Sequence, residues 1–192
     1  RQMITPFQGV GTGGNLNQDN RAATQGNWYT YYETIIKNLV DGLSALEDMP
    51  ERTNLEHIMK IWKAHAFIVL TDTYGDIPYT EAGKGYIDGV VFPKYDSQES
   101  IYTSILNDLE AAVQGLNDSN DDIGQEVMYS GNIEQWKRLG NSLLLRAGMR
   151  LSKVDPSSAA AYASKAVAGG LMQSNDDNAV VRHNADYRNG VG

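Results

Sequence analysis

The sequence predicts a mostly α-helical protein built from paired helices, and three observations point to this fold class. Apolar residues recur at spacings of three and four along five separate segments, which places them on one face of a helix each time. Glycines, prolines and capping residues lie between these segments, where helices have to end. No segment predicts a strand with comparable clarity, so we expect no sheet.

The five helical segments are expected at residues 28–48, 53–73, 97–116, 133–153 and 156–170. Pro50 breaks the chain after the first of them, and Gly75 is placed to end the second. Thr53 and Glu56 have the spacing of a capping box at the start of the second helix. Asp96 or Ser97 is expected to cap the third.

Irregular segments are expected between and around the helices. Residues 1–27 are rich in Gly, Asn, Gln and Thr and predict an irregular loop segment. Residues 76–96 hold several glycines and two prolines and predict a long loop, with room for one short hairpin around Gly89. Residues 117–124 predict a polar turn, and residues 171–192 an irregular start of a C-terminal part that is missing from this chain.

The helical segments pair as hairpins, and small residues occupy positions where helices approach closely. The last helix is rich in alanine between residues 159 and 168. The pattern resembles tetratricopeptide-type stacking, although a strict 34-residue repeat is not visible. We therefore expect residues 28–170 to form a tetratricopeptide-like α-α superhelix of helical hairpins with long irregular loops, and long loops in compact domains often carry function.

Composition excludes several classes of function. The 192 residues include 16 basic and 24 acidic side chains, a net charge of −8, so nucleic acid is not an expected partner. The absence of cysteine removes disulfide scaffolds, thiol catalysis and iron–sulfur clusters. The longest apolar run, residues 66–70, is far shorter than the roughly 20 residues of a membrane span.

The sequence contains no motif that points to catalysis, a cofactor or a metal. Its glycine-rich run at residues 9–14 precedes poor helix formers, which is not the setting of a dinucleotide site. His65 lies in an apolar helix segment and is expected to be a hydrogen-bonded core residue. Residues 118–124 read DSNDDIG and resemble the start of a calcium loop, but Ile123 and Tyr129 stand where its glycine and glutamate belong, which favours a solvated turn.

Tyrosine is the most informative residue type. There are 11 tyrosines and 3 tryptophans against 3 phenylalanines. The predicted loops hold Tyr74, Tyr79, Tyr86, Tyr95, Tyr129 and Tyr187. A loop tyrosine can stack on a sugar or lie in a protein interface, or it can pack its loop onto the helices with its hydroxyl bonded to a carbonyl. The second role is the more common for any single residue.

Four ordered blocks of sequence resemble the SusD-like proteins, in the second branch of the SusD/RagB superfamily. Residues 70–79 read LTDTYGDIPY and are similar to the helix end and turn of that family. Residues 31–46 resemble its early helix, and residues 92–102, FPKYDSQESIY, its next one. Residues 129–137, YSGNIEQWK, followed by NSLLLRAGMRLS at 141–152, resemble a further helix.

The resemblance implies a non-catalytic, lipid-anchored protein of the outer membrane, at the cell surface of Bacteroidetes-type bacteria. Such proteins bind oligosaccharides, or peptides in some members, and deliver them to a SusC-like TonB-dependent transporter. They need no cofactor and no metal. The alternative is a generic tetratricopeptide-type adaptor that binds proteins or peptides. Relatives are much longer, so we expect a fragment that lacks the lipid-bearing cysteine and the C-terminal part.

The candidate ligand residues combine hydrogen-bonding groups with aromatic rings. The early loop of relatives often contributes sugar contacts, and here it supplies Asn15, Asn17, Asp19 and Arg21 for hydroxyl groups. Three rings are candidates for stacking on sugars: Trp28, Tyr79 and Tyr86.

Overall fold

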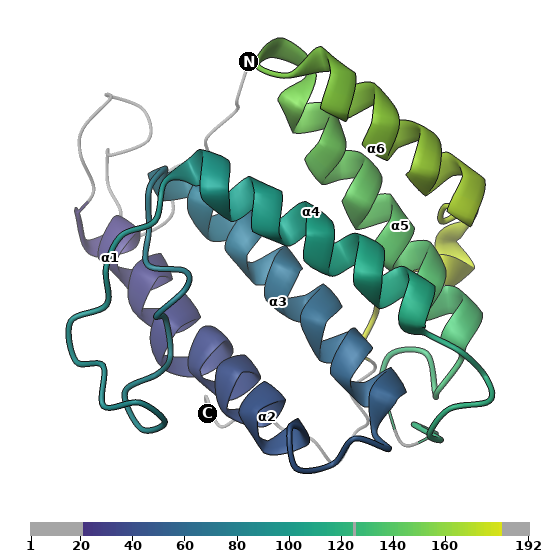
Figure 1. Ribbon diagram of the computed structural model, residues 1–192, viewed down its shortest axis with the longest axis horizontal. Coiled ribbons are helices and arrows are strands. Elements are labelled where there is room, and N and C mark those ends of the chain that lie inside the picture. The colour runs from purple at the N-terminus through teal and green to yellow at the C-terminus, as the bar shows by residue number, and fades with distance from the viewer. Residues whose placement is uncertain (1–20, 125, 182–192) are drawn as a thin grey trace, which may run out of the picture.

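The computed structural model describes residues 21–124 and 126–181, and this part of the chain is helical with long connections (Figure 1). Its helices are α1 (Arg21–Tyr29), the π-helical η1 (Thr30–Ile36), α2 (Lys37–Leu46), α3 (Thr53–Tyr74), α4 (Gln98–Gly115), α5 (Ile133–Arg150), the 3₁₀ turn η2 (Leu151–Lys153), α6 (Pro156–Gly169) and the 3₁₀ turn η3 (Asn175–Asp177). All five predicted helical segments are present, and the predicted fold class is confirmed.

The helices stack in the order of the chain, as in a tetratricopeptide superhelix. Each of α2 to α5 contacts the helix that follows it, and Figure 1 shows α3 beside α4 and α5 beside α6. The core runs through the whole stack and is apolar. Its fully buried large side chains are Trp136, Phe67, Ile36, Ile61, Ile68, Leu70, Ile77, Ile101, Ile105, Leu106, Leu109 and Leu116. Within the described residues, no helix is long and apolar enough to cross a membrane.

The first helix differs from its prediction at both its start and its middle. It begins at Arg21, seven residues before the predicted start at Trp28. The prediction rested on apolar periodicity, which a polar opening turn lacks even where Ala, Arg and Gln favour a helix. Its middle is a π-helical segment, in which the N–H of Lys37 donates to the carbonyl of Tyr32. Such a segment changes which side chains share a face of the helix.

The N-terminus of α3 is capped by a distant loop, and the predicted capping box is wrong. Arg52 occupies the N-cap position, and its side chain makes no capping hydrogen bond. Instead, the N–H of Asn54 donates to Oδ1 of Asp121 at 2.6 Å. The Asn54 amide donates to the carbonyl of Asn117 at 2.8 Å and accepts from the Asn117 N–H at 3.0 Å.

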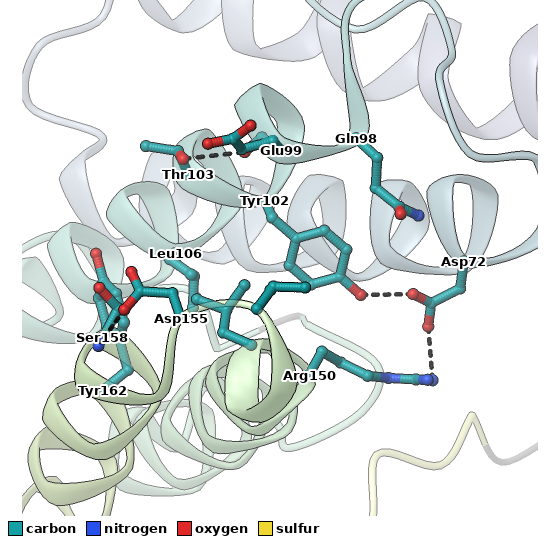
Figure 2. A pocket seen from close by; sticks show the side chains of 12 residues that line it. Asp72, Gln98, Glu99, Tyr102, Thr103, Leu106, Arg150, Asp155, Ser158 and Tyr162 are labelled. Carbon is teal, nitrogen blue, oxygen red and sulfur yellow. Dashed lines mark hydrogen bonds and ion pairs between the residues drawn. The ribbon is translucent and has the colours of Figure 1, made fainter.

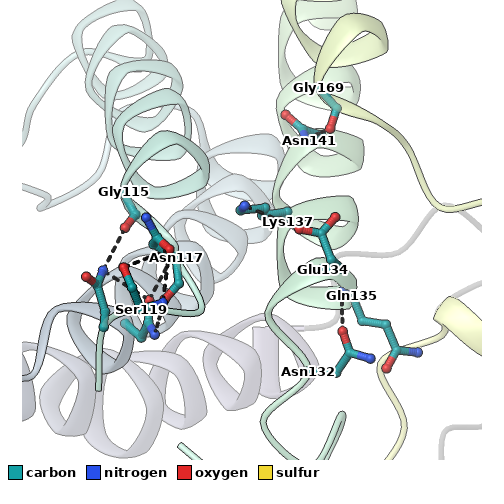
Figure 3. A network of polar contacts seen from close by, with 11 residues as sticks. Gly115, Asn117, Ser119, Asn132, Glu134, Gln135, Lys137, Asn141 and Gly169 are labelled. Atoms are coloured by element: carbon teal, nitrogen blue, oxygen red, sulfur yellow. Dashed lines mark hydrogen bonds and ion pairs between the residues drawn. The ribbon is translucent and has the colours of Figure 1, made fainter. Parts of the chain in front are cut away.

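The loop that resembles the start of a calcium site therefore joins the end of α4 to the start of α3. Figure 3 shows Asn117 and Ser119 turned toward one another at the end of α4. The second oxygen of Asp121 lies 3.4 Å from Nε of Arg52, so both oxygens of this carboxylate face the start of α3. No group of three or more His, Asp or Glu side chains suited to a metal occurs among the described residues.

The later helices begin at side-chain caps, and the one at Ser97 is among the two candidates that the sequence predicts for α4. Ser97 accepts from the N–H of Ser100 at the start of α4, and Asp155 accepts from that of Ser158 at the start of α6. Asn132 caps α5 through the N–H of Gln135, as Figure 3 shows. The predicted stop at Gly75 is confirmed, with a φ of 78°.

Residues 76–97 form a long loop between α3 and α4 that returns to its starting point. Ile77 and Asp96 form an isolated antiparallel bridge where the loop begins and ends. The hairpin expected around Gly89 is absent from the described residues; a turn takes its place, in which the N–H groups of Asp88 and Val90 both donate to the carbonyl of Lys84. The loop, teal in Figure 1, lies beside α1 and α2.

The segment after α6 is irregular as predicted, but it is anchored to the stack up to η3. Asp177 is 3% exposed and pairs with Nη1 of Arg138 at 2.9 Å. The Tyr129 hydroxyl donates to the Asp177 carbonyl at 2.6 Å. Asn141 in α5 likewise donates to the carbonyl of Gly169 at 2.9 Å, so polar contacts hold both ends of this segment (Figure 3).

Candidate functional site

The polar candidates of the early segment cannot be placed. Asn15, Asn17 and Asp19 lie outside the described residues, and Arg21 is described only as the first residue of α1. Their part in a ligand site stays a prediction. The three aromatic candidates are all described, and the structure separates them.

Trp28 lies in a cluster of rings between α1 and the long loop. Its ring is partly buried and stands 4.6 Å from that of Tyr32 and 5.1 Å from that of Tyr74. Tyr95 lies almost parallel to it, at 19° and a centroid distance of 6.3 Å. Trp28 therefore joins the start of the first helix to the end of the long loop, and its neighbour Tyr95 is 64% exposed.

Tyr79 is a core residue rather than a ring offered to a ligand. It is 8% exposed, its ring lies 4.5 Å from that of Phe67, and the Lys63 ammonium lies 5.2 Å from its centre. Its hydroxyl donates to Oδ2 of Asp108 at 3.2 Å, and burial together with Asp108 raises the pKa of Tyr79 far above its ordinary value. The common role of a loop tyrosine, to pack the loop onto the helices, describes this residue.

Tyr86 is open to solvent at the outer part of the loop. It is 86% exposed, and Nζ of Lys37 lies 5.1 Å from the centre of its ring. Such a cation–π contact holds one part of the ring near α2 and leaves most of its surface accessible. Of the three predicted rings, Tyr86 is the most accessible.

The first helix and the long loop carry further exposed apolar side chains. We call the aromatic surface the set formed by Trp28, Tyr29, Tyr86, Phe92 and Tyr95. Tyr29 is 54% exposed and Phe92 92% exposed, and the aliphatic neighbours Ile87 and Val91 are also exposed. Tyr95 is one of the loop tyrosines but not one of the predicted ligand residues, and Phe92 belongs only to a family motif. Exposure, which no local pattern encodes, is what distinguishes them from Tyr79.

The charges beside the aromatic surface are balanced in pairs. Lys37 lies 4.0 Å from Asp41, Lys84 lies 3.5 Å from Asp88, and Lys94 lies 4.0 Å from Glu81. Exposed pairs of this kind contribute little stability. Each of these three lysines has a carboxylate partner, so the three pairs add no net charge beside the rings.

A second feature is a polar groove of about 740 Å³ between α4 and α6, over the end of α5 (Figure 2). Asp72 accepts from the Tyr102 hydroxyl at 2.5 Å and pairs with Arg150 at 2.7 Å at one end. Asp155 and Tyr162 line the other end. Both oxygens of Asp72 are therefore engaged by other residues of the groove.

A wider hollow of about 960 Å³ lies between the start of α3 and the loop before α5. Trp62, Ile123 and Met128 make it largely apolar. The carboxylate of Glu126 accepts from the N–H of Tyr129 at 2.9 Å and from Nε1 of Trp136 at 3.1 Å. Glu126 thus holds the loop against α5, and its oxygens are occupied by that role.

His57, His65 and Tyr129 are partly or fully buried within the described residues. Burial lowers the pKa of His57 and of His65, and Nδ1 of His65 is buried without a hydrogen-bond partner, contrary to the expected hydrogen-bonded core histidine. Burial raises the pKa of Tyr129 to about 12. Its bond to the Asp177 carbonyl places it with the tyrosines that pack loops onto helices.

The fold and this surface define a class of protein: a tetratricopeptide-like helical binding protein that presents a loop-borne aromatic surface. A family model described as "Starch-binding associating with outer membrane" matches residues 1–190, and the chain belongs to this family, SusD-like 2. No curated protein matches the chain significantly.

Solved structures of this superfamily are similar to the chain. One is called a chitin-binding protein, with 37% identity, a TM-score of 0.78, and coverage of 88% of this chain and 36% of its own. A SusD-like protein, Bacteroidetes AC2a, has 32% identity and a TM-score of 0.78, with coverage of 88% and 31%. A chitin-binding SusD homologue from Flavobacterium johnsoniae has 31% identity and a TM-score of 0.68, with coverage of 78% and 32%. The chain thus spans about a third of their length.

Proposed function

We propose that this protein binds glycan nutrients at the cell surface, without catalysis, and delivers them to a SusC-like TonB-dependent transporter of the outer membrane. The single observation that carries the binding step is the aromatic surface. Flat rings that are exposed beside a rigid helical frame suit stacking on sugar rings. Membership of a family described as starch-binding supports the ligand class.

The ligand we propose is an uncharged oligosaccharide, and chitin oligosaccharides are the first to test. Two of the similar structures are named as chitin-binding. The paired charges around Tyr86 and Tyr95 give no preference for an acidic or sulfated sugar. Trp28 and Lys37, which contact the two tyrosines, are nine residues apart along the run of helices α1, η1 and α2, so the two rings lie at separate points along this run. The rings would therefore mark a track rather than a single sugar pocket.

The proposed function also includes delivery to a transporter and attachment to the outer membrane. The family is described as associating with the outer membrane. We propose that attachment uses a lipid anchor outside this chain and that no membrane-spanning segment is involved. The arrangement of genes tests the partner: a gene for a TonB-dependent transporter directly beside this one supports delivery to it, and its absence there contradicts it.

Binding is best tested by saturation-transfer NMR of the 192-residue chain with chitin and malto-oligosaccharides. We expect transfer to sugar protons and a dissociation constant of about 1 mM or tighter. Tyr86→Ala and Tyr95→Ala should each weaken it, because each removes a stacking face. Tyr162→Ala is the matched control, since this tyrosine lies at the polar groove, where Lys165 covers its ring. Absence of transfer to every oligosaccharide would overturn the proposal, and turnover of a glycan would overturn the non-catalytic part.

A second candidate function is peptide binding by an adaptor, and one observation favours it. The groove between α4 and α6 has the volume of a ligand site and mixed polar and apolar walls. The same NMR experiment with a library of short peptides separates the two functions. Saturation transfer to a peptide that is lost in Arg150→Ala and kept in Tyr95→Ala would favour the adaptor function.

A further inference from the structure

The two ends of the long loop that carries the exposed rings are joined by the pairing of Ile77 with Asp96. We call this pair of residues the neck of the loop. The N–H of Ile77 donates to the carbonyl of Asp96 at 3.2 Å, and the N–H of Asp96 donates to that of Ile77 at 2.9 Å. The segment between these two residues includes the exposed Tyr86 and Tyr95. A small number of contacts at the neck therefore controls the position of the rings.

The carboxylate of Asp96 supplies most of these contacts. Its Oδ2 accepts from the N–H of Tyr79 at 3.0 Å and from that of Thr80 at 2.8 Å. The Thr80 hydroxyl adds contacts of 3.1 and 3.0 Å to its two oxygens. Partial burial would raise the pKa of Asp96, but the amide hydrogen bonds from Thr80 and Tyr79 outweigh it and lower that pKa. The carboxylate is thus charged and fully used in joining the end of the loop to its start.

Two further contacts continue the closure on either side of Asp96. Farther out along the loop, Oε2 of Glu81 accepts from the N–H of Lys94 at 2.8 Å. On the helix side, the Tyr32 hydroxyl donates to the carbonyl of Pro78 at 2.7 Å. Ala82, just beyond the neck, is 2% exposed, so the inner part of the loop is packed while its outer part is open to solvent.

We propose that Asp96 is a positioning residue of the glycan site, one that closes the neck of the loop and so holds Tyr86 and Tyr95 ready for a sugar. This inference rests on the proposed function. A loop that is already ordered loses little conformational freedom when a ligand binds. Without the Asp96 carboxylate, the loop would have to lose this conformational freedom each time a ligand binds, and the affinity would fall. The helices would keep their packing.

Hydrogen exchange of the free protein tests the closure without any ligand. In Asp96→Ala, we expect the amides of Tyr79 and Thr80 to exchange at least about tenfold faster, since both lose their acceptor. Asp96→Asn keeps an oxygen at the same place and should restore most of the protection. Ser97→Ala is the matched control, because it removes the neighbouring cap of α4 and leaves the neck intact. Unchanged exchange in Asp96→Ala would overturn the proposal.

Oligosaccharide titrations of the same variants test the role in binding. We expect Asp96→Ala to weaken affinity for chitin oligosaccharides about tenfold with the circular-dichroism melt preserved, Asp96→Asn to recover most of it, and Ser97→Ala to bind as the wild type does. Faster amide exchange with unchanged affinity would overturn the role of Asp96 alone. Absence of binding by the wild type, with both amides protected, would overturn the proposed function itself.

Discussion

The N–H of Asn54 donates to Oδ1 of Asp121 across 67 positions of the chain, at 2.6 Å. A carboxylate from the loop after α4 therefore satisfies the first turn of α3, and its charge faces the positive end of the helix dipole. The same contact joins the first helical hairpin to the second. The pair is a tertiary contact that performs the task of a local cap.

Removal of this cap should destabilise the protein. We expect Asp121→Ala to lower the free energy of unfolding by about 1 to 2 kcal/mol, the usual effect of losing an N-cap acceptor, as measured by urea titration. Asp118→Ala, an exposed substitution in the same turn, is the matched control and should change it by less than about 0.5 kcal/mol. Equal effects of the two substitutions would contradict the cap.

Calcium should not stabilise the chain through this loop. Asp121 already serves Asn54 and Arg52, and the described residues hold no cluster of acidic ligands around it. We expect the melting temperature in millimolar calcium to equal that in chelator, as measured by circular dichroism. If calcium raises the melting temperature, and Asp118→Ala and Asp122→Ala abolish this increase, the loop binds calcium and the prediction is wrong.

Trp136 should be essential for folding and irrelevant to ligand contact. It is fully buried, its ring lies edge-on to Tyr129 at 5.2 Å and to Trp62 at 6.2 Å, and Nε1 donates to Glu126. Trp136→Ala should cost about 3 to 5 kcal/mol, enough to abolish the cooperative thermal transition. Tyr86→Ala, which removes an exposed ring, should leave the transition in place. A folded Trp136→Ala protein would show that the core assignment is wrong.

Two glycines in helices should respond in opposite directions to alanine. A Cβ on Gly115 would lie 1.9 Å from Nε2 of His57, so Gly115→Ala should destabilise the protein by about 1 to 3 kcal/mol through overpacking. A Cβ on Gly26 meets nothing within 4 Å, and Gly26→Ala should stabilise it by about 0.5 to 1 kcal/mol. Urea titration of both variants measures the contrast, and effects of the same sign would contradict it.

Stability should fall as the pH drops below about 6.5, the ordinary pKa of histidine. Burial and then Arg146 lower the pKa of His65 in the folded chain, so the unfolded chain binds a proton that the folded chain rejects. Stability therefore decreases from pH 6.5 down to the folded pKa and levels off below it. His65→Gln should reduce the slope of this part of the melting-temperature profile, and His57, whose pKa burial also lowers, accounts for slope that remains. An NMR titration of His65 that gives a pKa at or above 6.5 would contradict the prediction.

The helices and most of their ends could be predicted because they depend on residues close in sequence. The caps at Ser97 and Asp155 and the stop at Gly75 involve neighbours within a few positions. The start of α1 was placed too late because it has no apolar periodicity. The cap of α3 was assigned to Thr53 because a local candidate existed, and the true acceptor, Asp121, lies far along the chain.

The candidate site was only partly predictable for the same reason. Tyr79 and Tyr86 lie seven residues apart in the same predicted loop, yet Tyr79 is 8% exposed and Tyr86 86% exposed. Tertiary packing decides this difference, because Phe67 and Asp108 come from helices on either side of the loop. Helix periodicity, the local cap at Ser97 and the family motifs were determined by the sequence alone. Which rings face solvent, and the closure of the loop by Asp96, were decided only when distant segments met, since burial is a property of contacts across the chain.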